Sequence, residues 1–344
     1  MSTTEMAERA PASRLMTVVL IVLPVLLFLL SFLIGRFPVP PLTVIKVIAA
    51  QIVPITADWP AVVESVVFDV RLPRILAAMV VGGGLAMSGA CYQGVFRNPL
   101  VSPFTLGVSA GAGFGAAIAI LLFGQRYATQ LSAFIFGLVA VAFCLGMSRL
   151  YRLNSTIVLV LGGIIVGSLF SALLSLLKYV ADPNSKLPVI EFWLLGSLSS
   201  VSMADMVAVL IVAVPSALAL LSLRWRINIL AMGDEQARIL GVDADRLRIV
   251  VIVLSTLIAA STVSISGIIG WVGLVIPHFA RILVGPDFRR LLPATLSLGA
   301  CYLLGIDDLA RIMTAAEVPL GILTALVGAP VFILLLGRGG LGWA

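Results

Sequence analysis

Charged residues are scarce in this sequence. They make up 11% of its 344 residues, whereas 61% are hydrophobic, and the mean hydropathy is +1.17. This balance excludes an ordinary soluble domain and is typical of an all-α polytopic membrane protein. The net charge of +6 does not indicate nucleic-acid binding, because the basic residues are scattered among the polar connections and form no single patch.

Histidine and cysteine are also rare. The single histidine is His278, and the cysteines Cys91, Cys144 and Cys301 all lie in apolar runs, where we interpret them as small buried side chains. No pair among them has metal-ligand spacing, so we expect no metal site. We expect no catalytic residue either, because no carboxylate lies near His278 in the sequence and a histidine at the end of a span is the simpler interpretation.

Lysine occurs at Lys46, Lys178 and Lys186. A phosphate-binding loop requires Gly-Lys followed by Ser or Thr, and none of the three has that context. If ATP drives this protein, the ATPase is therefore another chain. The apolar runs also lack charges near their centres, which disfavours an ion-coupled secondary transporter; that alternative stays open, because broken helices bind ions through backbone carbonyls.

Charge-free apolar runs predict ten membrane spans. They lie near residues 15–35, 75–96, 104–125, 129–148, 155–177, 203–223, 249–266, 270–284, 292–306 and 318–337. The seventh and eighth form one stretch too long for a single span, so we divide it at Gly267 and Gly270. The first run is long enough to span a bilayer, so residues 1–14 are predicted to be an N-terminal tail and not part of a cleaved signal peptide.

The connections between the spans suggest additional short helices. Residues 36–69 contain five prolines, and the apolar piece at 42–53 is too short to cross, so we expect it to lie along the interface. A polar turn is predicted at 182–186. Residues 191–200 are expected to form a short surface or re-entrant helix, with Trp193 as an interfacial anchor.

The distribution of basic residues predicts the orientation. With the N-terminus in the cytoplasm and ten spans, 14 of the 22 Lys and Arg residues lie on the cytoplasmic side. Positive charge accumulates on that side of membrane proteins, so both termini are predicted to be cytoplasmic.

Glycine recurs at short intervals in the region that follows Arg71-Leu-Pro-Arg74. Gly107, Gly111 and Gly115 are four residues apart, a spacing that places them on one face of a helix, where a neighbouring backbone can approach closely. The face is either a packing seam alone or part of a functional assembly.

The longest cytoplasmic connection, residues 224–248, carries a predicted short helix. Acids in the first turn suit the helix dipole and a later glycine suits its end. The residues concerned are Gly233, Asp234, Glu235, Gln236, Ala237, Arg238, Gly241 and Val242. This helix is either a solvated connector or a rigid knob that a motor subunit grips.

Five motifs point to a family. They are Arg71-Leu-Pro-Arg74; Arg97-Asn-Pro-Leu-Val-Ser-Pro-Phe-Thr-Leu-Gly-Val-Ser-Ala-Gly111; Gly233-Asp-Glu-Gln-Ala-Arg-Ile-Leu-Gly-Val242; Gly273-Leu-Val-Ile-Pro-His-Phe-Ala-Arg281; and Glu317-Val-Pro-Leu-Gly321 with Gly328-Ala-Pro-Val-Phe332. In this order they closely resemble the permease subunits of bacterial type II ABC importers, which take up iron–siderophore complexes, haem and cobalamin. The resemblance covers roughly residues 60–340.

The resemblance implies an architecture and a set of partners. The whole chain, 1–344, would be one transmembrane permease domain in the bacterial inner membrane, surrounded by lipid and working as a homodimer with a central pore. Two ATP-binding cassette subunits would grip residues 233–242 and use ATP and magnesium, so this chain would bind no cofactor and catalyse nothing. A periplasmic binding protein would dock on the outer face.

The resemblance also implies roles for two residue sets. Arg71, Arg74 and Arg311 would meet acidic residues of the binding protein; the alternatives are headgroup anchoring or local pairs with Asp69, Asp307 or Asp308. Asn154, Ser155 and Thr156 would form the cytoplasmic pore gate, although the first two could equally cap a helix. The cargo stays open between siderophore, haem, cobalamin and an oxyanion such as molybdate.

Overall fold

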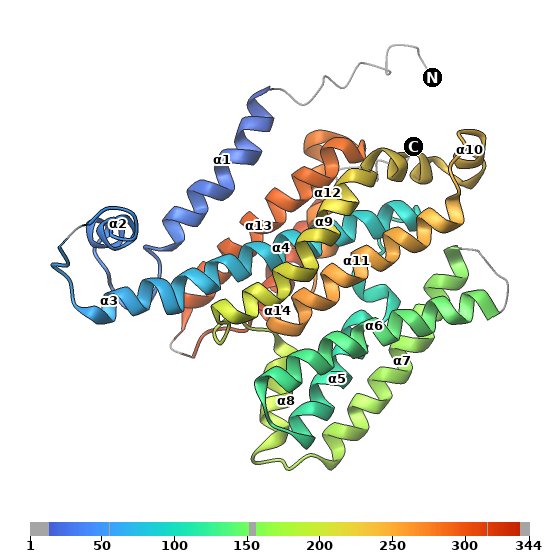
Figure 1. Cartoon of the computed structure of the whole chain (residues 1–344). Helices are drawn as coiled ribbons and strands as arrows, with labels where there is room; N and C mark the ends of the chain where they lie inside the picture. The colour runs from blue at the N-terminus through green and yellow to red at the C-terminus, as the bar shows by residue number, and fades with distance from the viewer. Residues whose placement is uncertain (1–13, 55, 151–155, 315, 338–344) are drawn as a thin grey trace.

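The computed structural model describes residues 14–54, 56–150, 156–314 and 316–337, and these form helices and connections with no β-strand among them (Figure 1). The α-helices are α1 (Arg14–Ser31), α2 (Pro41–Ala49), α3 (Ala61–Ser65), α4 (Leu72–Phe96), α5 (Val108–Leu122), α6 (Arg126–Leu150), α7 (Thr156–Val180), α8 (Lys186–Leu195), α9 (Met203–Met232), α10 (Asp234–Ile239), α11 (Ala244–Ser266), α12 (Val272–Val284), α13 (Phe288–Met313) and α14 (Leu320–Gly337). A π-helix, η1 (Val66–Arg71), and a 3-10 helix, η2 (Pro103–Leu106), complete the list. The all-α prediction is confirmed.

The long helices coincide with the predicted runs. Helices α1, α4, α5, α6, α7, α9, α11, α12, α13 and α14 each overlap one of them. Within the described residues, five segments are long and apolar enough to cross a membrane: Ala61–Phe96, Arg126–Ser148, Ile157–Val180, Met203–Met232 and Ala244–Ser266. The chain is thus an integral membrane protein, while the number of ten spans stays a prediction. The division at Gly267 is found, since α11 ends at Ser266 and Gly267 has a φ of 68°.

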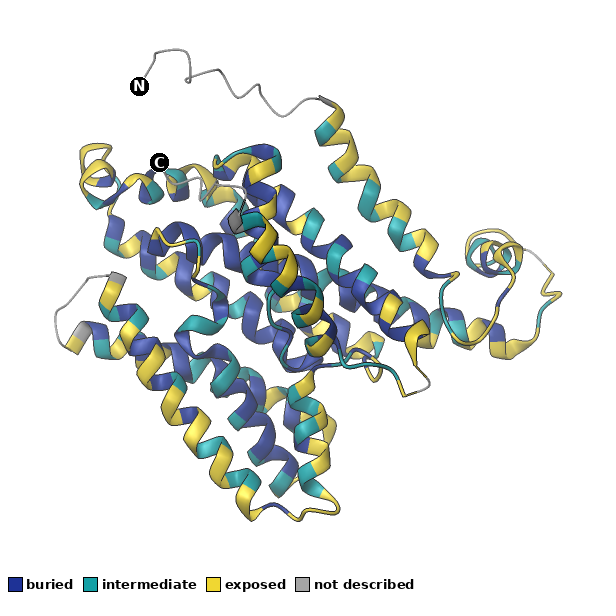
Figure 2. Ribbon diagram, turned by 180° about the vertical axis from the view of Figure 1, so that it is seen from behind, coloured by how far each residue is buried: buried dark blue, intermediate teal, exposed yellow. Residues whose placement is uncertain are grey.

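Helix α4 lies at the centre of the bundle, packed against α9, α11, α12 and α13 (Figure 1). Its residues are almost all buried from Pro73 to Phe96, as the dark blue interior of Figure 2 shows. Glycines bring the backbones together: a Cβ added at Gly82 would lie 2.2 Å from the carbonyl oxygen of Gly299, and one at Gly89 would lie 1.9 Å from that of Gly273. Small residues of this kind permit close helix packing in lipid.

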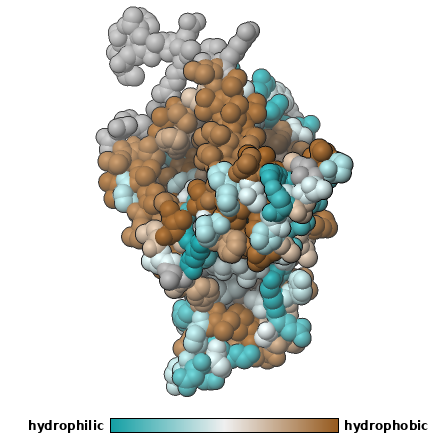
Figure 3. Space-filling view, turned by 90° about the vertical axis from the view of Figure 1, so that its left-hand side faces the viewer, coloured by the Kyte–Doolittle hydropathy of each residue, from teal (hydrophilic) through white to brown (hydrophobic). Residues whose placement is uncertain are grey.

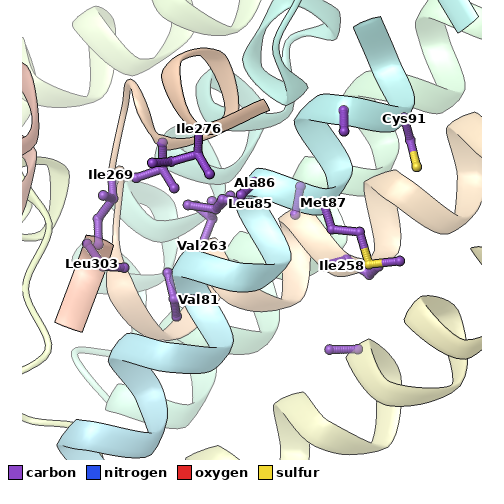
Figure 4. Packing of buried hydrophobic residues seen from close by; sticks show 14 of the residues in the cluster. Val81, Leu85, Ala86, Met87, Cys91, Ile258, Val263, Ile269, Ile276 and Leu303 are labelled. Carbon is purple, nitrogen blue, oxygen red and sulfur yellow. The ribbon is translucent and has the colours of Figure 1, made fainter. Parts of the chain in front are cut away.

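Apolar side chains fill the space between these backbones. Figure 4 shows Leu85 and Met87 of α4 together with Ile258 and Val263 of α11, all nearly or fully buried. The outer faces of the molecule carry apolar residues as well, which appear as broad brown areas in Figure 3. Apolar surface on both the inside and the outside fits a chain that is surrounded by lipid.

Helices α5, α6 and α7 form a second group, with α8 at one end (Figure 1). Cβ atoms added at Gly111 and Gly115 would lie 2.4 and 2.5 Å from carbonyl oxygens of α6, so α5 and α6 meet backbone to backbone at these two positions. The prediction that Gly107 shares this face is wrong. Gly107 precedes α5 in a left-handed conformation (φ 84°) and lies beside Gly167 of α7, because the chain must turn there from η2 into α5.

The helix that leads into the predicted second span starts earlier than the sequence indicated. Helix α3, η1 and α4 follow one another without a break, so the helical segment Ala61–Phe96 begins 14 residues before the predicted residue 75. Pro73 therefore lies inside this segment and not in its first turn. The wide π turn before it, in which the N–H of Leu72 bonds the carbonyl of Val67, carries the chain past a residue that has no N–H to donate.

Two short helices also differ from, or refine, the prediction. Helix α8 covers Lys186–Leu195 and ends at Gly196, so the expected helix at 191–200 was placed about five residues too late, since the chain turns into it directly after Asp182. Helix α2 stands to one side of the bundle (Figure 1) and occupies much of the expected 42–53 piece. A hydrogen bond from Lys46 lowers the pKa of Asp58 beside α2.

Candidate functional site

The three arginines predicted for docking come together at the end of the bundle opposite α10. Arg71 and Arg74 lie where η1 passes into α4, and Arg311 lies in the last turn of α13. Each is buried, with 4%, 7% and 5% of its surface exposed respectively. The topology therefore assembles residues that are 240 positions apart in sequence, but it turns them inward.

Acidic residues surround these arginines. Asp307, fully buried, accepts from Nε of Arg74 at 3.0 Å and from Nε of Arg311 at 2.9 Å. Asp308 pairs with Nη2 of Arg311 at 2.7 Å, and Glu317 pairs with Nη1 of Arg74 at 3.0 Å. Arg74 and Arg311 thus pair with three carboxylates, which is the arrangement that makes buried charge tolerable. The local pairing considered for Arg311 is present.

Main-chain and hydroxyl groups of the α1 end complete this network, which we call the arginine cluster (Arg71, Arg74, Asp307, Asp308, Arg311 and Glu317). Arg71 donates to the carbonyl oxygens of Phe32 and Phe37. The Ser31 hydroxyl donates to Asp308 and accepts from Nη2 of Arg311. The cluster therefore ties α1, α4 and α13 to the connection that leads into α14.

A hollow of about 210 Å³ opens over the cluster. Arg71, Arg74, Arg311 and Glu317 all contribute to its lining, together with residues 34–37 and the η1 residues Val66 and Val70. Glu317 has a left-handed backbone (φ 54°), an uncommon conformation for a residue with a side chain, and its ion pair with Arg74 helps to hold it. A carboxylate from outside could reach the guanidinium groups through this hollow.

The short helix predicted at 233–242 is α10, at the opposite end of the molecule (Figure 1). Gly233 (φ 126°) and Gly241 (φ 72°) turn the chain into and out of it, and Ala237 packs inward with no exposed surface. Ile239 and Leu240 point outward, 79% and 54% exposed. The result is a knob with apolar side chains at its tip.

Ion pairs fix this knob to the bundle. Asp234 accepts from Nη2 of the buried Arg248 at 2.7 Å and lies 3.9 Å from Arg97. Asp243, which follows the knob, caps the start of α11 by accepting from the N–H of Arg246. At the same end, burial works against ionisation of Asp287, but hydrogen bonds from Asn228 and from the N–H of Arg289 hold its pKa below the usual value.

The predicted pore gate can be placed only at one position. Asn154 and Ser155 lie outside the described residues, and Thr156 is the first residue of α7. His278 is buried inside α12 with 4% exposure, and its ring lies edge-on to Phe332 of α14 at 6.0 Å between centroids. It is thus a packed residue within the helix and not a residue at a helix end.

Two features escaped the sequence analysis. Ser31 and the carbonyl groups at the α1 end join the arginine cluster, and no local pattern could reveal a contact across 277 residues. A cavity of about 680 Å³ lies between α5, α6, α8 and the end of α11, and its lining comes from five separate stretches of the chain. Such a cavity exists only after the helices pack.

Comparisons with known proteins give a consistent result. The model of the FecCD transport family matches residues 21–338. The molybdate import system permease protein MolB of Haemophilus influenzae is 42% identical over 325 residues, covering 94% of this chain and 96% of MolB. An iron chelatin transport system permease protein of Helicobacter pylori is 41% identical over 273 residues, covering 79% of this chain and 82% of that protein. A solved metal-chelate type ABC transporter in an inward-facing conformation superposes with a TM-score of 0.83 at 42% identity, covering 93% of this chain and 97% of that one.

Proposed function

Because the chain belongs to the FecCD transport family, we propose that it forms the substrate pore of an ATP-driven importer that carries an iron chelate, haem or cobalamin across the bacterial inner membrane. The observation that carries this proposal is the anchored knob at α10, since a coupling element must be rigid and must offer a contact surface. The membrane would hold the chain with both termini in the cytoplasm, as a single permease domain over 1–344.

The proposed assembly is a homodimer with two ATPase subunits. Each ATPase would bind ATP and magnesium and grip the knob through Ile239 and Leu240. Two neighbouring apolar side chains exposed in water are typical of a protein-binding surface. The chain itself would bind no cofactor and would not hydrolyse ATP.

A binding protein would dock over the arginine cluster. We propose that each protomer of the dimer receives one lobe, that an acidic side chain of this lobe enters the hollow and competes with Glu317 for Arg74, and that Arg71 and Arg311 hold the surrounding backbone in place. Arginine suits this exchange because its planar guanidinium group can hold a carboxylate through two hydrogen bonds. The polar residues at 154–156 remain the proposed gate, and the Gly111 and Gly115 seam would hold α5 and α6 together during transport.

A second candidate cargo is an oxyanion. The reason is the similarity to MolB, which covers nearly the whole of both chains. The machinery would be the same, and the difference would lie in the binding protein and in the size of the sites that receive the cargo.

The function can be tested by reconstitution in liposomes with the ATPase and the binding protein encoded beside this chain. The chain alone should not hydrolyse ATP, and cargo should accumulate only in the full assembly. Ile239→Asp with Leu240→Asp should reduce ATP-driven uptake by about tenfold or more, because two charges replace the apolar tip of the knob. Leu100→Asp, which changes an exposed residue in another connection at the same end, serves as the control and should transport normally. ATP hydrolysis by the chain alone, or uptake driven by an ion gradient, would refute the proposal.

A further inference from the structure

Three exposed arginines lie together where α9 meets the start of α13, at the end of the bundle that carries α10. Arg224 lies in the last third of α9, and Arg289 and Arg290 are the second and third residues of α13. All three are exposed, and Nη1 of Arg224 lies 3.5 Å from the carbonyl oxygen of Arg289. We call these residues the basic triad (Arg224, Arg289 and Arg290).

The charge of the basic triad is compensated only in part by the described residues. Arg224 reaches a main-chain carbonyl oxygen, which carries no net charge. Arg289 and Arg290 interact electrostatically with Asp287, whose Oδ1 already accepts hydrogen bonds from Asn228 and from the N–H of Arg289. Three cations beside one carboxylate leave this surface positive.

The position of Arg289 and Arg290 is unfavourable for the helix that contains them. The first turn of a helix lies at the positive end of its dipole, where acidic side chains are stabilising and basic ones are not. The first turn of α13 has no acidic residue and two arginines. A negatively charged ligand would compensate both the dipole and the guanidinium groups.

An apolar stripe on α9 leads to the basic triad. Val207, Ile211, Val214 and Leu218 are 44–69% exposed, and their spacing of four, three and four residues places them on one face of the helix. Trp225 follows seven residues after Leu218 on the same face and is 49% exposed. Seven helical residues rise about 10 Å, so the face changes from aliphatic side chains to an indole ring over about the depth at which acyl chains give way to headgroups.

We propose that the basic triad binds the phosphate group of an anionic phospholipid whose acyl chains lie against the apolar stripe of α9. The three guanidinium groups would donate hydrogen bonds to the phosphate oxygens, for which their planar geometry is well suited. Trp225 would lie beside the glycerol backbone. In the orientation predicted from the basic residues, the lipid belongs to the cytoplasmic leaflet. The inference requires an integral membrane protein and does not depend on the cargo or on ATP.

The apolar stripe favours a lipid over two other ligands. A free phosphate ion would use the guanidinium groups but would make no use of the stripe or of Trp225. An acidic protein surface would approach the arginines from water, whereas the stripe continues along a segment that is long and apolar enough to cross the membrane. An anionic phospholipid carries the charge and the apolar chains in one molecule.

Fluorescence quenching by brominated lipids tests the inference on the purified full chain. The chain is reconstituted in mixtures of phosphatidylcholine and phosphatidylglycerol, one of which carries bromine on its acyl chains and quenches the tryptophans that it contacts. The part of the emission that Trp225→Phe removes reports on Trp225. For this part, phosphatidylglycerol should bind about tenfold more strongly than phosphatidylcholine, and the ratio should fall at high salt, because salt screens exposed charges.

Arg289→Gln combined with Arg290→Gln should bring this ratio close to one, since each arginine near a membrane surface contributes about a fivefold preference for anionic lipid. The midpoint temperature of thermal unfolding in detergent should be unchanged or higher in this double variant, because two cations are removed from the positive end of the helix dipole. Loss of lipid preference is thereby separated from loss of folding.

Arg226→Gln is the matched control. Arg226 is an exposed arginine of α9 that lies two residues after Arg224, and two residues turn an α-helix by slightly more than half a circle. Arg226 therefore points away from the basic triad, and its variant should keep the lipid preference of the wild type.

Four results would overturn the inference. Equal binding of the two lipids, or an unchanged ratio in the double variant, would show that the basic triad is not a headgroup site. A loss of preference in Arg226→Gln as large as that in the double variant would reduce the effect to the overall charge of this end of the molecule. Removal of the preference by inorganic phosphate at constant ionic strength would identify a site for free phosphate. Loss of binding to the partner ATPase in the double variant, with its lipid preference kept, would identify a protein contact.

Discussion

The segment Ala61–Phe96, which contains α4, is less apolar than helices α7 and α9, yet it is much more deeply buried inside the protein. The central segment has a mean hydropathy of 1.7 over its most apolar window, and 83% of that window is buried inside the protein. The spans in α7 and α9 each reach 2.6 with 28% buried. The most apolar helices are thus the ones that lie on the outside.

The solvent explains this inversion. In water, apolar side chains are driven to the interior, but lipid tails are as apolar as leucine and exert no such preference. Close packing then selects small residues such as Gly82 and Gly89 for the interior, while large side chains such as Ile211 and Leu218 of α9 are left to face the lipid or a partner. Stability should therefore depend on packing and on buried polar contacts far more than on hydropathy.

The largest expected effect concerns charge in the interior. Arg74→Met would remove one of the two arginine partners of Asp307 and the ion pair of Glu317 with Arg74, and loss of one member of a buried ionic network typically costs about 3–5 kcal/mol. The midpoint temperature of thermal unfolding in detergent should be much lower for this variant than for the wild type. Lys46→Met, which breaks an exposed pair, should change the free energy of unfolding by about 1 kcal/mol or less. Equal effects of the two variants would contradict a structural role for the arginine cluster.

The next test makes the same Leu→Ala substitution in the buried interior and on the exposed outer face. Leu303→Ala removes a fully buried side chain of α13 and should cost about 2–5 kcal/mol through the cavity that it leaves. Leu218→Ala on α9, where Leu218 is 60% exposed, should cost about 0.5 kcal/mol or less, since lipid fills the space. The measurement is the midpoint of unfolding in a denaturing detergent titration. A large effect at Leu218 would mean that this face is covered by another protein chain and not by lipid.

The smallest expected difference tests the seam between α5 and α6. Gly111→Ala forces a methyl group to within 2.4 Å of the carbonyl oxygen of Phe136, and overpacking of this kind costs about 1–3 kcal/mol. Gly146→Ala, within α6, places its methyl group where no described atom lies within 4 Å, and should be neutral or slightly stabilising because alanine favours helix. The measurement is the midpoint temperature of thermal unfolding of each single variant. If Gly146→Ala is destabilised and Gly111→Ala is as stable as the wild type, the close contact between helices lies elsewhere.

The positions of most long helices along the chain could be predicted, because the length and the apolar character of a run are local properties of the sequence. The runs that became α6, α7, α9 and α11 needed no knowledge of their neighbours, and the acids and glycines around α10 marked a short helix by themselves. Hydropathy failed at residues 61–74, where Glu64, Asp69, Arg71 and Arg74 interrupt the apolar pattern. Arg71 and Arg74 are tolerated within a helix because the carbonyl oxygen of Phe32, just after α1, accepts from Arg71, and Asp307 of α13 pairs with Arg74. Such partners cannot be read from a local window.

Sequence alone thus determined that the chain crosses a membrane, where its long helices lie, that it lacks a phosphate-binding loop, and to which family it is similar. Each of these depends on residue type and spacing within a single stretch. Only the tertiary structure decided that Arg71, Arg74 and Arg311 turn inward, that Gly107 leaves the face shared by Gly111 and Gly115, and that a cavity lined in part by Lys186 lies between four helices. The physical reason is that burial and ion pairing are properties of two surfaces in contact, and the second surface comes from another part of the chain, as for Arg74 and Asp307, which are 233 residues apart.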